Sequence, residues 1–318
     1  MKALSSFPRV SLGVFPTPVQ RLDNISRLLR VNVYVKRDDL TGLGLGGNKI
    51  RKLEYLLADA REKGAELVFT TGGAQSNHAM LTAAAAAKLG MKAILILKKR
   101  GVTARQGNQL LEHLMGTEVH FMDTDDYADI YEEMERMGRA SGRPFYKIPC
   151  GGSNALGSLG YVACAQEIRD QGPCFDYLVC AEGSGGTLAG LALGAKLFLP
   201  GTRVCGMMVD TDPFDEITLR LMKEAAALLE LELEPEPGDF VLRDQCGPGY
   251  AVPSPEGNAA VRLMAEQEGL FLDPVYTGKA FAGLIAMAEE GQFKEDDRVL
   301  FLHSGGAGGL FALDAEIG

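Results

Sequence analysis

The feature that most constrains the fold is the alternation of short apolar segments with longer segments of helical patterning. Apolar runs at 67–70, 93–97 and 177–181 predict buried strands, and the segments 49–63 and 77–89 predict helices that end beside a glycine. Parallel strands need a crossover between them, so strands that alternate with helices indicate parallel sheets covered on both faces. The sequence therefore predicts an α/β fold, with open parallel sheets in three layers.

The length of 318 residues favours two domains, because one domain typically has about 100–200 residues. A stretch rich in glycine, serine and asparagine at 150–160 is either a domain boundary or a ligand loop, and we expect the next helix to begin at 161. After a long helix at 216–230 the chain is acidic and contains prolines, which predicts a solvated loop and a polar hairpin.

Composition excludes several classes of function. The formal net charge is −10 and no long run of lysine and arginine occurs, so we expect neither nucleic acid nor a membrane surface as a partner. No segment approaches the length of a membrane span, and the N-terminus lacks the apolar core of a signal peptide. The six cysteines contain no Cys-x-x-Cys pair and are expected to be reduced thiols, which fits a cytoplasmic location.

Metal and serine-hydrolase chemistry have little support. The four histidines, His78, His113, His120 and His303, lack metal-ligand spacing, so no metal site is expected. No Gly-x-Ser-x-Gly motif occurs, because Ser184 and Ser304 lack its framing glycines.

A glycine-rich loop at 42–47 leads into a predicted helix that opens with Lys49. Glycines let the backbone approach a ligand closely, and a lysine at a helix start can be positioned and partly desolvated. This arrangement suits an amine that forms a Schiff base. A flexible loop before a solvated lysine explains the same segment equally well.

A second loop, at 72–76, separates a predicted strand from a helix that begins with Asn77 and His78. Free N–H groups at a helix N-terminus bind anions, and Ser76 and Asn77 add side-chain donors beside them. A substrate carboxylate fits such a site. Ordinary helix capping by Ser76 or Asn77 is the commoner role of such a segment.

A third loop, from Glu182 to Thr187, lies between an apolar strand and an apolar helix. Its small residues expose backbone N–H groups, and Ser184 and Thr187 add hydroxyls, which favours a phosphate site over a tight structural turn. The loop is not a P-loop, since no Gly-Lys-Ser/Thr follows. It is a poor dinucleotide fingerprint, because Leu188 stands where the third glycine belongs.

Together these segments resemble the fold type II, tryptophan-synthase-like pyridoxal-phosphate enzymes, in particular the group of 1-aminocyclopropane-1-carboxylate deaminase and D-cysteine desulfhydrase. The resemblance covers nearly the whole chain in order. The matching motifs are 35–39, 46–54, 75–78, 151–154, 247–250, 272–279 and 303–306.

This resemblance implies pyridoxal 5′-phosphate as the cofactor and assigns roles to individual residues. Lys49 is implied as the Schiff-base lysine and proton carrier, and Ser76, Tyr250 and Tyr276 as further catalytic residues. The segment Ser76, Asn77 and His78 is implied to bind the substrate carboxylate. The residues implied to bind the cofactor are Lys49, Lys52, Asn77, Gly183, Ser184, Gly185, Gly186, Thr187, Thr277 and Ser304.

The resemblance also implies a homodimer, and we expect two domains that are discontinuous in sequence. Residues 1–49 plus 161–318 are expected to form the large cofactor-binding domain. Residues 50–160 are expected to form a small, mobile domain, with the cofactor between the two.

Thr277 favours D-cysteine desulfhydrase within the group, because the deaminases carry a glutamate there that faces the pyridine nitrogen. A hydroxyl leaves the ring a weaker electron sink, which suits simple β-elimination. His78 also resembles the desulfhydrases, whereas 79–82 departs from their usual arginine and glutamine. The expected reaction converts D-cysteine to pyruvate, sulfide and ammonia.

Several alternatives remain open. Within the class they are an L-cysteate sulfo-lyase, a cyclopropane deaminase and an eliminase of D-serine or β-chloroalanine. The basic cluster 98–100 is expected to be a solvated strand end, although it could recognise a sulfite leaving group. Outside the class, the chain could be a catalytically idle ligand-binding homologue. It could also be a dehydrogenase that uses Asp210 or Asp212 as a ribose ligand.

Overall fold

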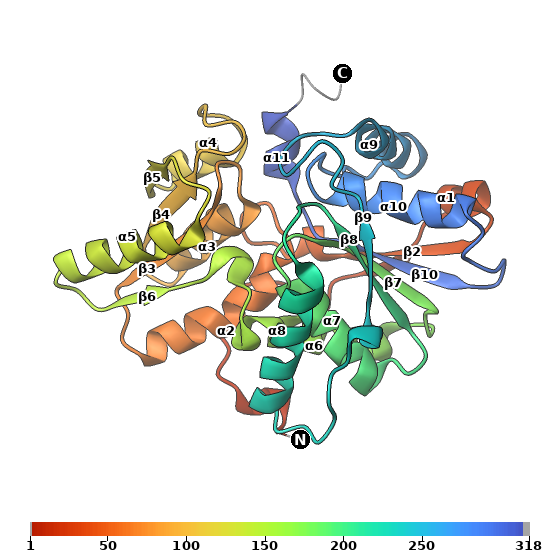
Figure 1. The fold of residues 1–318 in the computed structure, drawn as a ribbon, viewed down its shortest axis with the longest axis horizontal. Helices are drawn as coiled ribbons and strands as arrows, with labels where there is room; N and C mark the ends of the chain where they lie inside the picture. Colours follow the sequence, from red (N-terminus) through yellow and green to blue (C-terminus); the bar gives the residue numbers. More distant parts are fainter. Residues whose placement is uncertain (1, 314–318) are drawn as a thin grey trace.

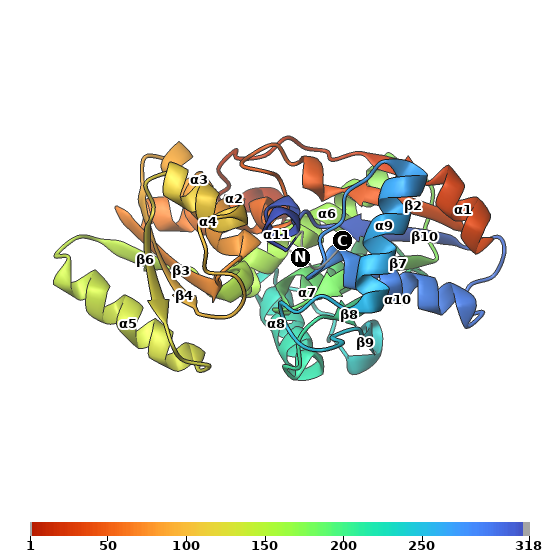
Figure 2. The same cartoon turned by 90° about the horizontal axis from the view of Figure 1, so that it is seen from above.

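The computed structural model describes residues 2–313, which form two largely parallel sheets between layers of helices (Figure 1). The order of strands is β1-β2-β10-β7-β8-β9 in the larger sheet and β5-β4-β3-β6 in the smaller. In the view of Figure 2 the smaller sheet lies at the left and the larger at the right.

The larger sheet consists of β1 (Val19–Arg21), β2 (Asn32–Arg37), β7 (Tyr177–Glu182), β8 (Arg203–Met208), β9 (Val241–Asp244) and β10 (Arg298–His303). The smaller sheet consists of β3 (Leu67–Gly73), β4 (Lys92–Lys98), β5 (Glu118–Met122) and β6 (Phe145–Lys147). The helices are α1 (Asp23–Leu29), α2 (Lys49–Glu62), α3 (Asn77–Lys88), α4 (Gly107–Leu114), α5 (Tyr127–Ala140), α6 (Ala155–Gln171), α7 (Gly186–Phe198), α8 (Phe214–Leu228), α9 (Pro255–Glu268), α10 (Thr277–Glu289) and α11 (Ala307–Ala312), with short 3₁₀ turns at Leu4–Ser6, Asp38–Leu40, Cys150–Gly152 and Pro237–Asp239.

Side-chain alternation along the strands explains why both faces of each sheet are covered. On β7, Leu178 and Cys180 pack in a core with α6, α7 and α8, whereas Val179 between them packs in a core with α1, α9 and α10. On β4, Ile94 packs with α5 and Leu95 with α3. Because successive strand residues face opposite sides, continuously apolar strands need helices on both sides. The predicted three-layer α/β fold is confirmed.

The smaller sheet draws its strands from residues 67–147, and the larger sheet from 19–37 and 177–303. The helix α2 connects the two parts, since it packs on both α3 and α6. The predicted domain limits after residues 49 and 160, and the mobility of the small domain, stay predictions. None of the helices within residues 2–313 has the length and apolarity needed to span a bilayer.

Two edge strands differ from the prediction. β1 was not predicted, and it pairs antiparallel with β2. β9 lies in the region predicted as a polar hairpin, but it pairs parallel with β8, so that prediction was wrong. Both strands are short, and a run of three or four residues carries too little alternation to be recognised.

The helix α6 begins at Ala155, six residues before the predicted start, within the stretch expected to be a loop. Asn154 caps it by accepting the Gly157 N–H at 2.8 Å. A β-carbon at Gly160 would lie 2.4 Å from the Arg51 carbonyl oxygen. The glycines of this stretch therefore allow close packing of α6 on α2.

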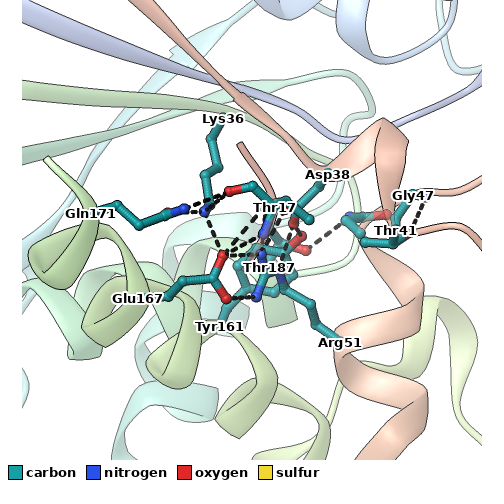
Figure 3. A network of polar contacts seen from close by, with 11 residues as sticks. Thr17, Lys36, Asp38, Thr41, Gly47, Arg51, Tyr161, Glu167, Gln171 and Thr187 are labelled. Carbon is teal, nitrogen blue, oxygen red and sulfur yellow. Dashed lines mark hydrogen bonds and ion pairs between the residues drawn. The ribbon is translucent and has the colours of Figure 1, made fainter. Parts of the chain in front are cut away.

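A buried network of charges fixes the start of α2 (Figure 3). Arg51 donates to both carboxylate oxygens of Asp38 at 2.8 Å, and to both oxygens of Glu167 at 2.9 Å. The Tyr161 hydroxyl donates to Asp38 at 2.6 Å, and Lys36 pairs with Glu167. Burial alone would raise the pKa of Asp38, but Arg51 and the other partners lower it overall. This network gives the predicted motif 35–39 a structural role.

Candidate active site

A cavity of about 300 Å³ lies where the starts of α2, α3 and α7 meet the ends of β7 and β8. Its volume is within the range of small-molecule sites. The predicted site residues that line it are Lys49, Ser76, Asn77, His78, Gly183, Ser184, Thr187, Tyr250, Tyr276 and Ser304. The predicted residues that do not line it are Lys52, Gly185, Gly186 and Thr277.

Lys49 is the first residue of α2, and its side chain reaches the cavity. The preceding turn holds Lys49 in this position. Gly46 has φ 73°, and a β-carbon at Gly46 would lie 1.9 Å from the Asp39 carbonyl oxygen, so the turn requires glycine there. The Asn48 N–H donates to the Ser304 carbonyl at 3.0 Å. No ion pair to Lys49 occurs within residues 2–313. Burial lowers the pKa of Lys49, although Cys150 and Glu182 oppose this. A larger fraction of the amine is therefore uncharged and able to react with an aldehyde.

The donors predicted to bind a phosphate gather one turn further along the same face of α2, around Lys52. The Lys52 ammonium donates to the Gly151 carbonyl at 3.1 Å and to Ser153 Oγ at 3.2 Å. A β-carbon on Gly186 would lie 2.9 Å from Lys52 Nζ, so glycine at 186 makes room for the ammonium. Thr187 Oγ1 accepts from Asn48 at 3.1 Å, so its own proton remains available to a ligand. Burial lowers the pKa of Lys52 well below its usual value, and Lys49 adds to this.

The backbone of the predicted phosphate loop, 182–187, has fewer free N–H groups than its sequence suggests. Glu182 Oε1 accepts the N–H groups of both Ser184 and Gly185, and Ser153 Oγ accepts that of Gly186. The expectation that successive amides face a phosphate is therefore only partly met. Within α7, Thr187 is the second residue, so its N–H has no carbonyl partner in the preceding turn.

The start of α3 presents donors to the cavity. Ser76 caps the helix by accepting the Ala79 N–H at 3.2 Å, and its hydroxyl proton remains available. Asn108 donates to Asn77 Oδ1 at 2.8 Å, which fixes the Asn77 amide and leaves its NH₂ group as a donor. A β-carbon on Gly72 would lie 2.3 Å from Ser76 Oγ, so glycine at 72 makes room for the serine.

The tautomer of His78 follows from its neighbours. Thr70 Oγ1 gives its only proton to the Ile148 carbonyl at 3.0 Å, so His78 Nε2 must donate to Thr70 across their 2.8 Å contact. His78 Nδ1 is then an unprotonated acceptor, and it is buried without a partner among the described residues. Burial lowers the pKa of His78 well below its usual value, Lys49 and Lys52 add to this, and the backbone at Pro149 opposes it. The imidazole cannot donate to a carboxylate, so only the His78 backbone N–H can do so.

Tyr250 and Tyr276 meet at the cavity wall with their hydroxyl oxygens 2.5 Å apart. Burial raises the pKa of Tyr250, which the Tyr276 hydroxyl partly opposes, and burial also raises the pKa of Tyr276 well above its usual value. Both phenols therefore stay protonated around neutral pH.

The predicted contact between Thr277 and the pyridine nitrogen stays a prediction. Thr277 Oγ1 donates to Asp273 Oδ1 at 2.6 Å and accepts the Asp273 N–H at 2.8 Å. A hydroxyl has one proton, so toward a ring nitrogen Thr277 can act only as an acceptor. Ser304, in contrast, lines the cavity directly.

The basic cluster 98–100 lies outside the cavity lining. Lys98 is buried, with its ammonium 3.5 Å from the centroid of the Tyr127 ring, so the expected solvated strand end holds only for Lys99 and Arg100. The charged groups that do line the cavity, apart from Lys49 and Glu182, are Asp210, Asp212 and Arg220.

The residues present fit pyridoxal phosphate. One cavity is surrounded by an amine that has no ion pair among residues 2–313 and by hydroxyl donors beside a buried lysine. Two buried polar atoms there, His78 Nδ1 and Glu182 Oε2, have no hydrogen-bond partner in the same part of the chain. No group of three or more potential metal ligands occurs within residues 2–313. The family model for pyridoxal-phosphate-dependent enzymes matches residues 10–305. The chain belongs to this family.

Individual relatives agree with this assignment. The chain is 43% identical to D-cysteine desulfhydrase of Klebsiella pneumoniae, over 98% of each protein. It is 47% identical to a Pyrococcus horikoshii protein provisionally named 1-aminocyclopropane-1-carboxylate deaminase, over 97% of this chain and 94% of that one. A crystal structure described as an ACC deaminase homologue superposes with a TM-score of 0.93 and 44% identity, over 99% of this chain and 96% of the other. The predicted family, fold type and cofactor are confirmed.

Sequence reasoning missed three residues that shape the site. Glu182 and Ser153 occupy donors of the phosphate loop, and Asn108 orients Asn77 from the start of α4. Glu182 and Ser153 were within noticed motifs, and a carboxylate inside a phosphate loop was a usable signal. Asn108 carried no signal, because its contact joins residues 31 positions apart.

Proposed function

We propose that this protein is a β-elimination lyase that converts D-cysteine and water to pyruvate, hydrogen sulfide and ammonia. The observation that carries the proposal is the buried amine of Lys49 in one cavity with the α3 N-terminus, the phosphate loop and the tyrosine pair. The bound cofactor supplies an electron sink for the electrons left at the substrate α-carbon.

Lys49 has two roles in this proposal. Its Nζ atom would hold the cofactor through the cofactor's aldehyde carbon, and the same amine would take the proton from the substrate α-carbon. The burial that lowers the pKa of Lys49 favours the uncharged amine that both roles need. Lys52 from α2 and the hydroxyls of Ser184 and Thr187 hold the phosphate, and Ser153 supports Ser184 by donating to it at 2.9 Å.

The substrate carboxylate binds at the start of α3. The Ser76 hydroxyl and the backbone N–H groups of Asn77 and His78 are the donors, since the first N–H groups of a helix have no partner within it. The Asn77 NH₂ group, oriented by Asn108, contacts the cofactor's phenolic oxygen.

The tyrosine pair keeps a proton near the leaving group. Tyr250 and Tyr276 share a short contact, and their raised pKa values keep both hydroxyls protonated. One hydroxyl donates a hydrogen bond to the departing sulfur, and the other hydroxyl donates to the first, which strengthens that bond.

Two observations support D-cysteine over the other substrates. Position 277 holds threonine in place of the glutamate of the deaminases. Asp210 and Asp212 line the cavity, and their carboxylates disfavour the sulfonate of L-cysteate. Arg220 does not offset them fully, because it pairs with Glu224 at 2.9 Å. The second candidate function is 1-aminocyclopropane-1-carboxylate deaminase, because the Pyrococcus horikoshii relative carries that name.

The test is a product assay with four substrates on the purified enzyme. We expect D-cysteine to give pyruvate and sulfide with the highest kcat/KM among D-cysteine, L-cysteate, D-serine and the cyclopropane acid. Lys49→Ala should form no product at a measurable rate. A higher kcat/KM for 2-oxobutyrate release from the cyclopropane acid would select the deaminase, and no product from any of them would favour an idle binding protein.

We also propose a cytoplasmic homodimer. Leu110 and Leu114 on α4, and Phe311 on α11, are exposed apolar side chains on two helices that pack together, which suits a subunit interface. Sedimentation equilibrium should give about twice the chain mass of 34.1 kDa. A mass equal to one chain would contradict the homodimer.

A further inference from the structure

A carboxylate lies inside the loop that serves the cofactor phosphate. Glu182, the last residue of β7, is almost fully buried and lines the cavity. Its Oε1 accepts the N–H of Ser184 at 2.8 Å and that of Gly185. Its Oε2 is buried and has no hydrogen-bond partner among residues 2–313. Oε1 therefore accepts two hydrogen bonds from the loop, and Oε2 accepts none from the described residues.

The charged groups around Glu182 do not neutralise it. Lys49 and Lys52 face it from α2, and the Cys180 thiol faces it from its own strand. Neither lysine forms an ion pair with Glu182, since no such pair within 4.0 Å occurs among the described residues. The Lys52 ammonium instead donates to Gly151 and Ser153. A phosphate bound at this loop would place its negative charge beside an ionised Glu182. The two negative charges would repel each other, and this repulsion favours protonation of one of them.

We propose that Glu182 holds the cofactor phosphate as a neutral carboxylic acid. Oε1 keeps the two loop amides, and Oε2 carries a proton that it donates to a phosphate oxygen. The proton comes from solvent when the cofactor binds. This proposal uses the cofactor assignment and is independent of the substrate.

The protonated form accounts for both oxygens. A carboxylic acid has one carbonyl oxygen that accepts and one O–H group that donates. Oε1, which accepts two amide N–H groups, matches the first, and Oε2, which has no donor beside it among the described residues, matches the second. Burial raises the pKa of Glu182 even though the loop amides and the two lysines lower it. The alternative is an ionised Glu182 that only occupies the loop amides until the phosphate displaces it.

The test measures cofactor affinity rather than turnover. Pyridoxal phosphate is titrated into the apo-protein from pH 6 to 9, and its Kd is compared between wild type and Glu182→Gln. Glutamine keeps an acceptor and a donor at the two positions but cannot ionise. The exposed Glu216→Gln, on α8, is the matched control for the loss of one charge.

We expect the ratio of the wild-type Kd to the Glu182→Gln Kd to rise about tenfold per pH unit once Glu182 ionises. Titration of the phosphate itself cancels in this ratio. Glu182 also raises the pKa of Lys49, so the same ratio measured with pyridoxal, which lacks the phosphate, reports the contribution of Lys49. Calorimetry in buffers of different ionisation enthalpy should show wild type taking up as much as one proton more than Glu182→Gln. Glu216→Gln should follow wild type in both measurements.

Three results would overturn the proposal. The Kd ratio could stay constant over the pH range, or pyridoxal without its phosphate could show the same ratio. Tighter binding by Glu182→Ala than by both wild type and Glu182→Gln would identify a displaced carboxylate instead.

A measurement on wild type alone covers the case in which the variants fold poorly. Infrared difference spectra should gain a protonated-carboxyl C=O stretch on cofactor binding. No gain would contradict the proposal. None of these measurements involves a substrate, so failure of the proposed reaction leaves them unaffected.

Discussion

Two buried polar regions meet on the first turn of α2, and they differ in how far their groups are satisfied. Around Arg51, each carboxylate oxygen of Asp38 and Glu167 has a donor. Around Lys49, only two positions earlier, His78 Nδ1 and Glu182 Oε2 have no partner among the described residues. Unsatisfied buried groups cost stability unless a ligand completes them. The first region therefore fixes the helix, and the second is prepared for a ligand.

The largest expected effect comes from breaking the satisfied region. Arg51→Met leaves Asp38 buried without its main partner and removes one of the two cations that pair with Glu167, and should lower the free energy of unfolding by about 3–5 kcal/mol. Chemical denaturation measures this change. Arg61→Met, on the exposed side of the same helix, should change it by less than about 0.5 kcal/mol. Equal effects from both variants would contradict the role of the network.

Glu112 tests whether an unpaired carboxylate outside the cavity behaves differently. It lies buried on α4, and neither of its carboxylate oxygens has a hydrogen-bond partner among residues 2–313. Burial raises its pKa from 4.5 to about 8, which nearby Gln109 opposes. The folded state therefore holds a proton that the unfolded state loses between these values. Stability should fall as pH rises from about 5 to 8, by about 2–4 kcal/mol.

Glu112→Gln removes this titrating group and should flatten the stability profile. Urea denaturation of both proteins across pH 5–8 measures the difference. A parallel decline in wild type and variant would show that Glu112 is not the cause. His113→Ala, exposed on the same helix, is the matched control for a substitution in α4 that leaves Glu112 in place.

Asn108 supports the cavity from outside it. Asn108→Ala removes the donor to Asn77 Oδ1, which should weaken cofactor binding by about 0.5–1.5 kcal/mol, or roughly two- to tenfold in Kd. Fluorescence titration of the apo-protein measures this change, again with His113→Ala as control. An unchanged Kd would separate Asn108 from cofactor binding.

The smallest effect is expected at His78, whose imidazole should show no titration near neutral pH. His78 should remain neutral, with its proton on Nε2, over the pH range in which an ordinary histidine titrates. Nitrogen-15 NMR of the imidazole reports both properties. A shift typical of imidazolium near pH 6, or a proton on Nδ1, would contradict the hydrogen-bond assignment.

Local patterning was sufficient to predict much of the fold. The strand at 177–181 and the lysine that opens α2 follow from apolar runs and glycine positions alone. The start of α6 was missed because glycines that usually mark loops here serve the contact between Gly160 and Arg51. Such a contact depends on the packing of two helices, which no local pattern contains.

The site shows the same limit. Ser76 and the 183–187 loop were recognisable, because they combine small residues with a helix start. The hydrogen bonds of Glu182 and the single proton of Thr277 were not, since they depend on which neighbour accepts or donates. The sequence was therefore sufficient to predict which residues belong to the site, but not which hydrogen bonds those residues form.

The attachment of the cofactor to Lys49 is the claim on which the rest depends. Borohydride reduction of the wild-type holoenzyme, followed by peptide mass spectrometry, fixes and locates the pyridoxyl group. We expect it on Lys49, with two other buried lysines, Lys52 on α2 and Lys279 on α10, unmodified. A pyridoxyl group on either of those lysines, or on none, would contradict the account.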